Sequence, residues 1–174
     1  MTNEMERRAA ELEVRATKNR QLEGYAAVFN ERAKIADFEE LILPGAFGAT
    51  LRDQPNADIL ALVDHDPRSL LGRRRNRSLD LSEDTRGLHF RIALAYDILA
   101  LAEAGSLGGA SFGFKALKEQ WTGTLRTLKA IDLREVSIVR SFPAYEGTVV
   151  HARSRVPDSP LARRLRLLEL ESGQ

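Results

Sequence analysis

The chain has 174 residues, of which 26 are lysine or arginine and 25 are aspartate or glutamate, and it contains no cysteine. This length suits one domain with a buried core, and the balanced charge argues against a protein that mainly neutralises nucleic-acid phosphates. The absence of cysteine excludes disulfides, thiolate metal sites and cysteine nucleophiles, and no apolar run reaches the ~18 residues of a membrane span. We therefore expect a cytoplasmic protein with neither nucleic acid nor membrane as a partner.

Extended patterns dominate the first part of the chain. They cover residues 11–16, 21–29, 35–43 and 57–63. The first two flank the polar turn Lys18-Asn19-Arg20 and predict a hairpin with inward-facing Leu12, Val14, Leu22 and Tyr25. Pro44-Gly45 ends the third segment, after which residues 46–52 are expected to form a short helix. The fourth segment is an apolar run that ends just before His65.

Further strand-like patterns follow in the second part. They cover residues 79–84, 87–94, 114–118, 125–139 and 148–151. The turn Thr85-Arg86-Gly87 joins the first pair into a second hairpin. Helical spacing of Leu and Ile side chains predicts one helix over residues 96–104, with Gly105 as its stop. The fold class is therefore mainly β or α+β, with short helices inserted between strands.

Arginine gathers in two places. The run Arg73-Arg74-Arg75-Asn76-Arg77 is either a patch for phosphates or acidic partners or a solvated loop between strands, and the near-zero net charge favours the loop. A second group begins at Arg153 and continues beyond the break Pro157-Asp158-Ser159-Pro160, where Ser159 is suited to cap an amphipathic helix. We accordingly divide the chain into a main domain, residues 1–152, and a basic tail, residues 153–174.

A serine in a glycine-rich setting is the first candidate for chemistry. Gly109-Ala110-Ser111-Phe112-Gly113 matches the G-x-S-x-G pattern of a hydrolase nucleophile elbow. An elbow is preceded by a strand and followed by a helix, whereas here a predicted helix precedes Ser111 and a strand-like segment follows it. The alternative is a glycine-rich turn that enters a strand.

A serine nucleophile needs a base, and three histidines are available: His65, His89 and His151. His65 lies between two aspartates at a strand end, where it is either a base or a solvated turn residue. His89 alternates with apolar neighbours and is expected to face solvent or a cross-strand partner. These dispersed histidines do not form the spacing of a zinc site, so we predict neither a metal nor a cofactor.

The order of several short motifs resembles the prohead serine protease family of tailed bacteriophages. The resemblance covers residues 11 to 152. It rests on Gly24-Tyr25-Ala26-Ala27-Val28-Phe29, Leu43-Pro44-Gly45-Ala46-Phe47, Val63-Asp64-His65-Asp66, Leu70-Leu71-Gly72-Arg73, Gly87-Leu88, Gly108-Gly109-Ala110-Ser111-Phe112-Gly113-Phe114, Leu133-Arg134-Glu135-Val136-Ser137-Ile138-Val139 and Pro143-Ala144-Tyr145.

The resemblance implies a β-barrel similar to that of herpesvirus assemblin, closed or nearly closed and surrounded by short helices. It gives Ser111 the role of nucleophile and His65 the role of base. The third member in the herpesvirus enzymes is a second histidine, and here Glu135 occupies the corresponding stretch as the expected orienter, with His151 as the alternative. Asp64 departs from the asparagine that often precedes the histidine, and Arg140 is a candidate helper of the oxyanion.

The family resemblance also implies a function. It predicts a serine endopeptidase that processes phage scaffold and major capsid precursor inside the assembling prohead, in the cytoplasm of a bacterial host. Self-cleavage that removes the tail and a homodimer are further expectations. The alternatives are a non-catalytic capsid assembly protein and an esterase of the α/β-hydrolase class.

Overall fold

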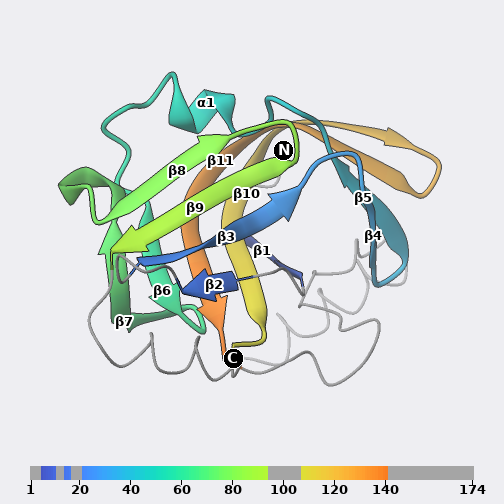
Figure 1. Cartoon of the computed structure of the whole chain (residues 1–174). Helices are drawn as coiled ribbons and strands as arrows, with labels where there is room; N and C mark the ends of the chain where they lie inside the picture. Colours follow the sequence, from blue (N-terminus) through green and yellow to red (C-terminus); the bar gives the residue numbers. More distant parts are fainter. Residues whose placement is uncertain (1–4, 11–13, 17–20, 94–106, 141–174) are drawn as a thin grey trace, which may run out of the picture.

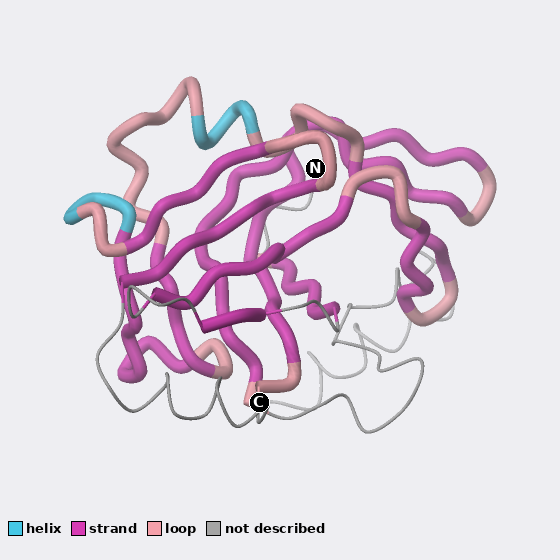
Figure 2. The backbone as a smooth tube through the Cα atoms, in the orientation of Figure 1, coloured by secondary structure: helices cyan, strands magenta, loops and turns pink. Residues whose placement is uncertain are grey.

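The computed structural model of the protein describes residues 5–10, 14–16, 21–93 and 107–140. These residues are mainly in β-strands, as Figure 2 shows. The strands are β1 (Glu6–Ala10), β2 (Val14–Ala16), β3 (Gln21–Val28), β4 (Arg32–Ile35), β5 (Phe38–Ile42), β6 (Leu60–Val63), β7 (Asp66–Arg73), β8 (Leu79–Glu83), β9 (Gly87–Ala93), β10 (Gly109–Thr122) and β11 (Leu125–Val139). The described helices are the short α1 (Gly48–Leu51) and the 3₁₀ turn η1 (Arg74–Asn76). The prediction of a mainly β protein is confirmed.

The strands form two sheets, whose strands cross each other in Figure 1. One sheet has the order β1-β10-β11-β5-β4, with β6 and β7 added beside the second half of β11. The other has the order β2-β3-β9-β8. The described strands pair within these two sheets and do not close into the predicted barrel, because no strand continues its hydrogen bonding from one sheet into the other.

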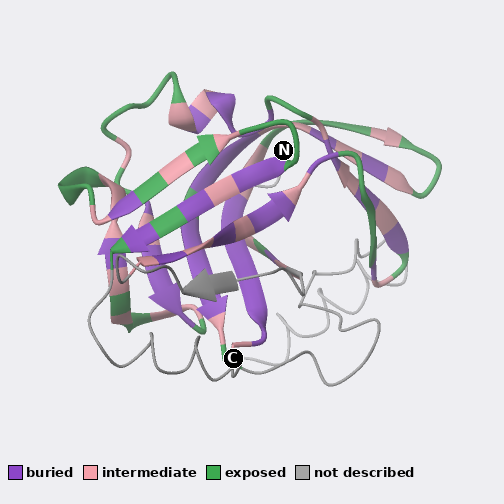
Figure 3. Ribbon diagram, in the orientation of Figure 1, coloured by how far each residue is buried: buried purple, intermediate pink, exposed green. Residues whose placement is uncertain are grey.

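Large apolar side chains from both sheets form the hydrophobic core. Figure 3 shows in purple the buried stretches of the strands. Phe90 and Leu22 come from the four-stranded sheet, Phe114 and Leu133 from the long β10–β11 hairpin, and Phe47 from the segment before α1. Burial of each such side chain contributes about 1.5–3 kcal/mol relative to leaving it in water. The face of β10–β11 that carries Phe114 and Leu133 is therefore the core face, and the opposite face remains for other uses.

Bulges shift which residues of β11 point to the core. Between the cross-strand pairs Phe114–Leu133 and Gly113–Glu135, Arg134 has no partner on β10. An extra residue in one strand reverses the alternation beyond it. Leu133 and Val136 therefore both pack in the core, while Glu135 between them faces the other side.

Most sequence-predicted strands are confirmed. The opening hairpin is β2–β3, the second hairpin is β8–β9, and the last long strand is β11. Residues 35–43 differ from the prediction: instead of one strand, β4 and β5 form a hairpin around Ala36, whose φ of 50° permits the tight turn. Tyr25 was expected to face inward together with Leu22, yet its hydroxyl donates to Asp84 at the surface. The two residues are three positions apart in a regularly paired part of β3, so strand alternation places them on opposite faces.

Some predicted features cannot be compared with the structure. They lie outside the described residues: the predicted helix 96–104, the strand 148–151 with His151, the tail, and the side chains of Leu12 and Val14. Of the helices that the structure describes, none has the length and apolar character to cross a membrane.

The arginine run is not simply a solvated loop. Arg74 donates hydrogen bonds to the backbone carbonyls of Thr50, Leu51 and Gln54, which lie at and after the end of α1. A guanidinium at this place donates to carbonyls that the helix leaves unpaired, and its positive charge interacts favourably with the negative end of the helix dipole. This part of the run therefore anchors α1.

A buried ion cluster joins strands of the larger sheet. Arg8 makes two hydrogen bonds to Glu40, at 2.6 and 2.8 Å, and Arg126 donates to the same carboxylate at 2.9 Å. Arg126 also binds Glu6 and Glu119. Burial by itself would lower the pKa of Arg126, but these carboxylates raise it above its ordinary value. The side chains of Arg8, Glu40 and Arg126 are at most 7% exposed, so the cluster depends on every partner.

Replacing Glu40 by alanine should lower the free energy of unfolding by about 3–5 kcal/mol, because two arginines lose a buried partner. Glu39→Ala is the matched control on the same strand, since Glu39 pairs with Arg32 at the surface and its loss should cost about 1 kcal/mol or less. Urea unfolding of the two variants measures the difference. Equal losses would contradict the assignment of Glu40 to a stabilising cluster.

Candidate active site

His65 occupies a tight turn between two strands. Asp64 and His65 join β6 to β7, and both have positive φ angles, 46° and 61°. A two-residue hairpin loop of type I′ requires positive φ at both positions, which glycine and asparagine usually fill. A side chain in this region costs roughly 1–2 kcal/mol per residue, so the surrounding contacts must hold the turn in place.

Glu135 binds the ring of His65. The distance between His65 Nδ1 and Glu135 Oε1 is 2.5 Å, and the two side chains are 17% and 8% exposed. β6 runs parallel to β11, with Leu60 in register with Glu135 and Val63 with Ile138, and the side chain of His65 in the turn after β6 contacts Glu135. Burial tends to raise the pKa of Glu135, but the hydrogen bond and charge of His65, together with Arg7, bring the pKa below its usual value of 4.5. The carboxylate is thus held in its ionised form next to the imidazole.

Gly113 allows Arg7 to reach the same carboxylate from β1. Arg7, Gly113 and Glu135 are in register on three neighbouring strands, and Arg7 Nε lies 3.1 Å from Glu135 Oε1. A Cβ atom at position 113 would lie 2.6 Å from Cγ of Glu135, which is closer than real contacts allow. The second glycine of the G-x-S-x-G match therefore makes space for Glu135.

Ser111 lies on β10 in the next row of the same face. It pairs with Ser137 on β11, and Glu135 is one step away on the diagonal. Both serine side chains are fully buried, and neither hydroxyl has a hydrogen-bond partner in the part of the chain that the structure describes. A buried hydroxyl without a partner costs about 1–3 kcal/mol, so the side chains of Ser111 and Ser137 stand out among the buried groups of this face.

The predicted site residues thus lie on one face of the sheet. The structure joins His65 to Glu135 and places Ser111 on the same face, although no hydrogen bond connects His65 with Ser111 among the described residues. Ser111 is inside the antiparallel strand β10, so it lies neither at a strand-to-helix elbow nor in a glycine-rich turn before the strand. His89 has its expected cross-strand partner, with its ring 5.3 Å from that of Tyr25.

Sequence reasoning did not identify three residues near this site: Arg7, Gly113 in its role as a spacer, and Ser137. Ser137 follows Glu135 by two positions, the spacing of residues that share a strand face, so it could have been noticed. The contact of Arg7 carries no such local signal. Arg140, a candidate oxyanion helper, instead donates from both its backbone N–H and Nε to the Asp64 carboxylate.

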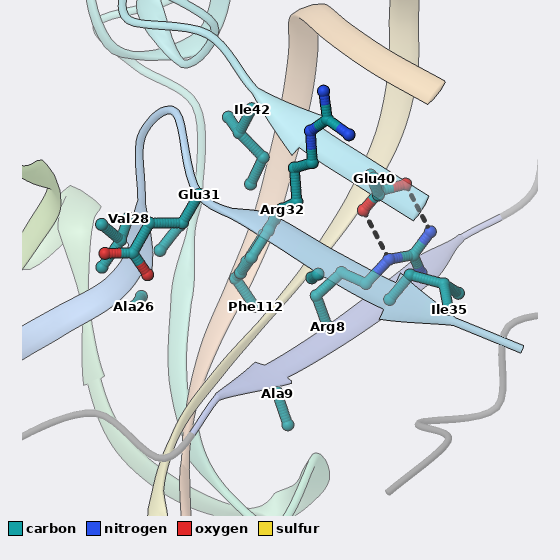
Figure 4. A pocket seen from close by; sticks show the side chains of 12 residues that line it. Arg8, Ala9, Ala26, Val28, Glu31, Arg32, Ile35, Glu40, Ile42 and Phe112 are labelled. Atoms are coloured by element: carbon teal, nitrogen blue, oxygen red, sulfur yellow. Dashed lines mark hydrogen bonds and ion pairs between the residues drawn. The ribbon is translucent and has the colours of Figure 1, made fainter. Parts of the chain in front are cut away.

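A pocket of about 130 Å³ lies elsewhere (Figure 4). Ala26, Ile42 and Phe112 contribute apolar walls, and the ion pair of Arg8 with Glu40 lies beside them. Neither Ser111 nor His65 lines this pocket, and Phe112 alternates with Ser111 along β10. Within the described residues no group of acidic or histidine side chains has the arrangement of a metal site.

The lowered pKa of Glu135 predicts a pH-dependent contribution to stability. A carboxylate whose pKa is lower in the folded state stabilises above its unfolded pKa, and this stabilisation disappears as the pH falls through the folded value. The difference in free energy of unfolding between the wild type and Glu135→Gln should therefore be largest near neutrality and shrink below about pH 4.5. Denaturant unfolding from pH 7 to pH 3 measures it, and a difference independent of pH would contradict an ionised Glu135 in the folded protein.

Comparison with known proteins places this chain in a family. Residues 4–160 match the model of the caudovirus prohead serine protease family. The chain is 35% identical over 144 residues to the prohead protease of Enterobacteria phage HK97, which covers 77% of this chain and 60% of that protein. No solved structure matches the chain. The family match spans most of the sequence, and the chain therefore belongs to the caudovirus prohead serine protease family.

Proposed function

We propose that the protein is a serine endopeptidase in which Ser111 is the nucleophile, His65 the general base and Glu135 the orienter. The contact of His65 Nδ1 with the ionised Glu135 is the observation that carries this proposal. It leaves Nε2 of the imidazole as the nitrogen that can accept a proton. Glu135 is preferred to His151 as orienter because it contacts the ring.

The reaction proceeds through an acyl-enzyme. Ser111 Oγ attacks the carbonyl carbon of the peptide bond while His65 Nε2 takes the hydroxyl proton, and Glu135 stabilises the imidazolium that forms. The imidazolium then gives its proton to the leaving amine as the C–N bond breaks. A water molecule attacks the ester in the same manner and releases Ser111.

The spacing of the strands supports this arrangement. Diagonal neighbours across an antiparallel pair, such as Ser111 and Glu135, are roughly 7–8 Å apart, a gap that an imidazole ring with one hydrogen bond on each side can bridge. Catalytic hydrogen bonds are often long before substrate binds. The contact between His65 and Ser111 is accordingly proposed to form with bound substrate.

The family and the name of the HK97 relative support the choice of substrates. We expect phage scaffold and major capsid precursor to be cleaved inside the assembling prohead in the host cytoplasm. Residues 1–152 form the catalytic domain in this proposal, with self-cleavage removing the tail 153–174 and a homodimer as the active form. The fold is proposed to be a relative of the assemblin barrel with its two sheets left open.

Replacing Ser111 by alanine should abolish cleavage of a co-expressed capsid precursor while the protein remains folded, because no other group forms the acyl-enzyme. Ser137→Ala is the matched control, since Ser137 is equally buried, lies on the same face and also lacks a partner among the described residues. Gel analysis of the precursor gives the result. Continued processing by Ser111→Ala, with loss in Ser137→Ala, would assign the nucleophile to Ser137.

Replacing Gly113 by alanine should lower the rate of cleavage by about 100-fold, because the new methyl group displaces the Glu135 side chain and with it His65. Gly48→Ala is the control, since the atoms nearest to its added methyl group belong to the flexible end of the Arg52 side chain. The rate of precursor processing and the thermal unfolding midpoint are measured together. Full activity of Gly113→Ala would show that Glu135 does not position the base.

A further inference from the structure

We propose that Asp64 is a positioning residue that, together with Arg140, holds His65 in place for the reaction. This inference rests on the proposed role of His65 as the general base. It concerns the residue immediately before the histidine, which binds neither Glu135 nor Ser111 in the described part of the chain. Three hydrogen bonds connect Asp64 to the end of β11.

The bonds come from both the backbone and the side chain of Asp64. Its N–H donates to the carbonyl of Ile138 at 3.0 Å. Its carboxylate accepts from the backbone N–H of Arg140 at 2.9 Å and from Arg140 Nε at 2.7 Å. Together they form what we name the turn clamp, consisting of Asp64, Ile138 and Arg140. The clamp extends the parallel pairing of β6 and β11 by one step beyond Val63.

The clamp is needed because the turn that carries His65 is strained. Asp64 and His65 both have positive φ angles. Glycine usually occupies at least one such position in a two-residue turn, and this turn contains none. A strained turn persists only when its surroundings hold it. The bond of His65 to Glu135 fixes the ring, and the clamp fixes the backbone just before it.

Both anchors are on the same strand. Glu135 lies within β11, and Arg140 directly follows this strand. The turn that carries His65 is therefore attached to β11 at two points, before and after residues 136–139. A movement of the turn by about an ångström would change the direction of the imidazole, and misplacement of this size can cost about 100-fold in rate. The clamp thus acts on the rate through the position of His65.

The contribution of the clamp to global stability is expected to be small. The side chains of Arg140 and Asp64 are 59% and 35% exposed, and an ion pair that is open to solvent contributes little to folding. Asp66, on the other side of His65, has a similar exposure of 34% but binds Arg68 within its own strand. Asp66 is therefore a close internal control for charge and exposure without a clamp.

Four variants test the clamp through two readouts. Asp64→Gly tolerates the positive φ but removes the carboxylate, whereas Asp64→Asn tolerates it and keeps an oxygen for the N–H of Arg140. Arg140→Ala removes the guanidinium, and Asp66→Ala is the control. The first readout is the rate at which a fluorophosphonate probe labels Ser111, a reaction in which Oγ bonds to phosphorus, fluoride leaves and the hydroxyl proton passes to His65. The second is the downfield proton NMR signal of His65 Nδ1–H bound to Glu135.

Asp64→Gly should lower the maximal labelling rate by about 10- to 100-fold, with little change in the probe concentration that gives half of that rate. Its Nδ1–H signal should broaden or disappear at an unchanged unfolding midpoint. Asp64→Asn should restore most of both, Arg140→Ala should fall between, and Asp66→Ala should behave as the wild type. Wild-type labelling and NMR signal in Asp64→Gly, or an Asn variant as impaired as the Gly variant, would overturn the clamp.

The two readouts separate this inference from the proposed function. If wild-type protein is not labelled at Ser111, the proposed nucleophile is wrong, but the NMR signal still reports whether Asp64 positions His65. If the wild type is labelled and the NMR signal is insensitive to position 64, the clamp alone is wrong.

Discussion

The antiparallel pairing of β10 with β11 determines where both the core and the candidate site lie. One face of this hairpin supplies the core with Phe114, Leu133 and Val136, and the other face carries Ser111 and Glu135. The two faces remain distinct because the bulge at Arg134 reverses the alternation of β11 at one point. Without the bulge, a carboxylate would replace an apolar side chain in the core, which costs several kcal/mol unless the charge is paired. Bulges next to functional sites commonly redirect a side chain in this way.

The candidate site contains a largely buried carboxylate, whose charge is compensated by neighbouring side chains of the sheet. Glu135 is mostly buried and accepts hydrogen bonds from His65 and Arg7. His65 follows β6, which pairs with β11, and Arg7 belongs to β1, which pairs with β10. Gly113 lies between them and has no side chain to prevent the meeting. The low pKa of Glu135 follows from these partners, which outweigh the effect of burial. An ionised carboxylate is what an imidazole base requires from its orienter.

Two ion-pair arrangements in the same sheet have different physical consequences. Arg8, Glu40 and Arg126 are withdrawn from water, so removal of one partner leaves an uncompensated charge and affects stability. The turn clamp of Asp64, Ile138 and Arg140 is open to solvent, where charge contributes little to folding but hydrogen-bond geometry still fixes a strained turn. Burial therefore separates residues that hold the sheet together from residues that direct one side chain.

The sequence was sufficient to predict the strand-rich class, the bounds of β11 and the candidates Ser111, His65 and Glu135, because alternation and motif order can be read along the chain. It did not reveal β1 or β7, the division of residues 35–43 into two strands, or the structural role of Arg74. The family resemblance implied Glu135 as the partner of His65, but the geometry of that contact and the approach of Arg7 to the same carboxylate depend on tertiary structure. The register between strands far apart in sequence depends on the packing of the whole sheet, and a single bulge such as that at Arg134 changes which face a residue occupies.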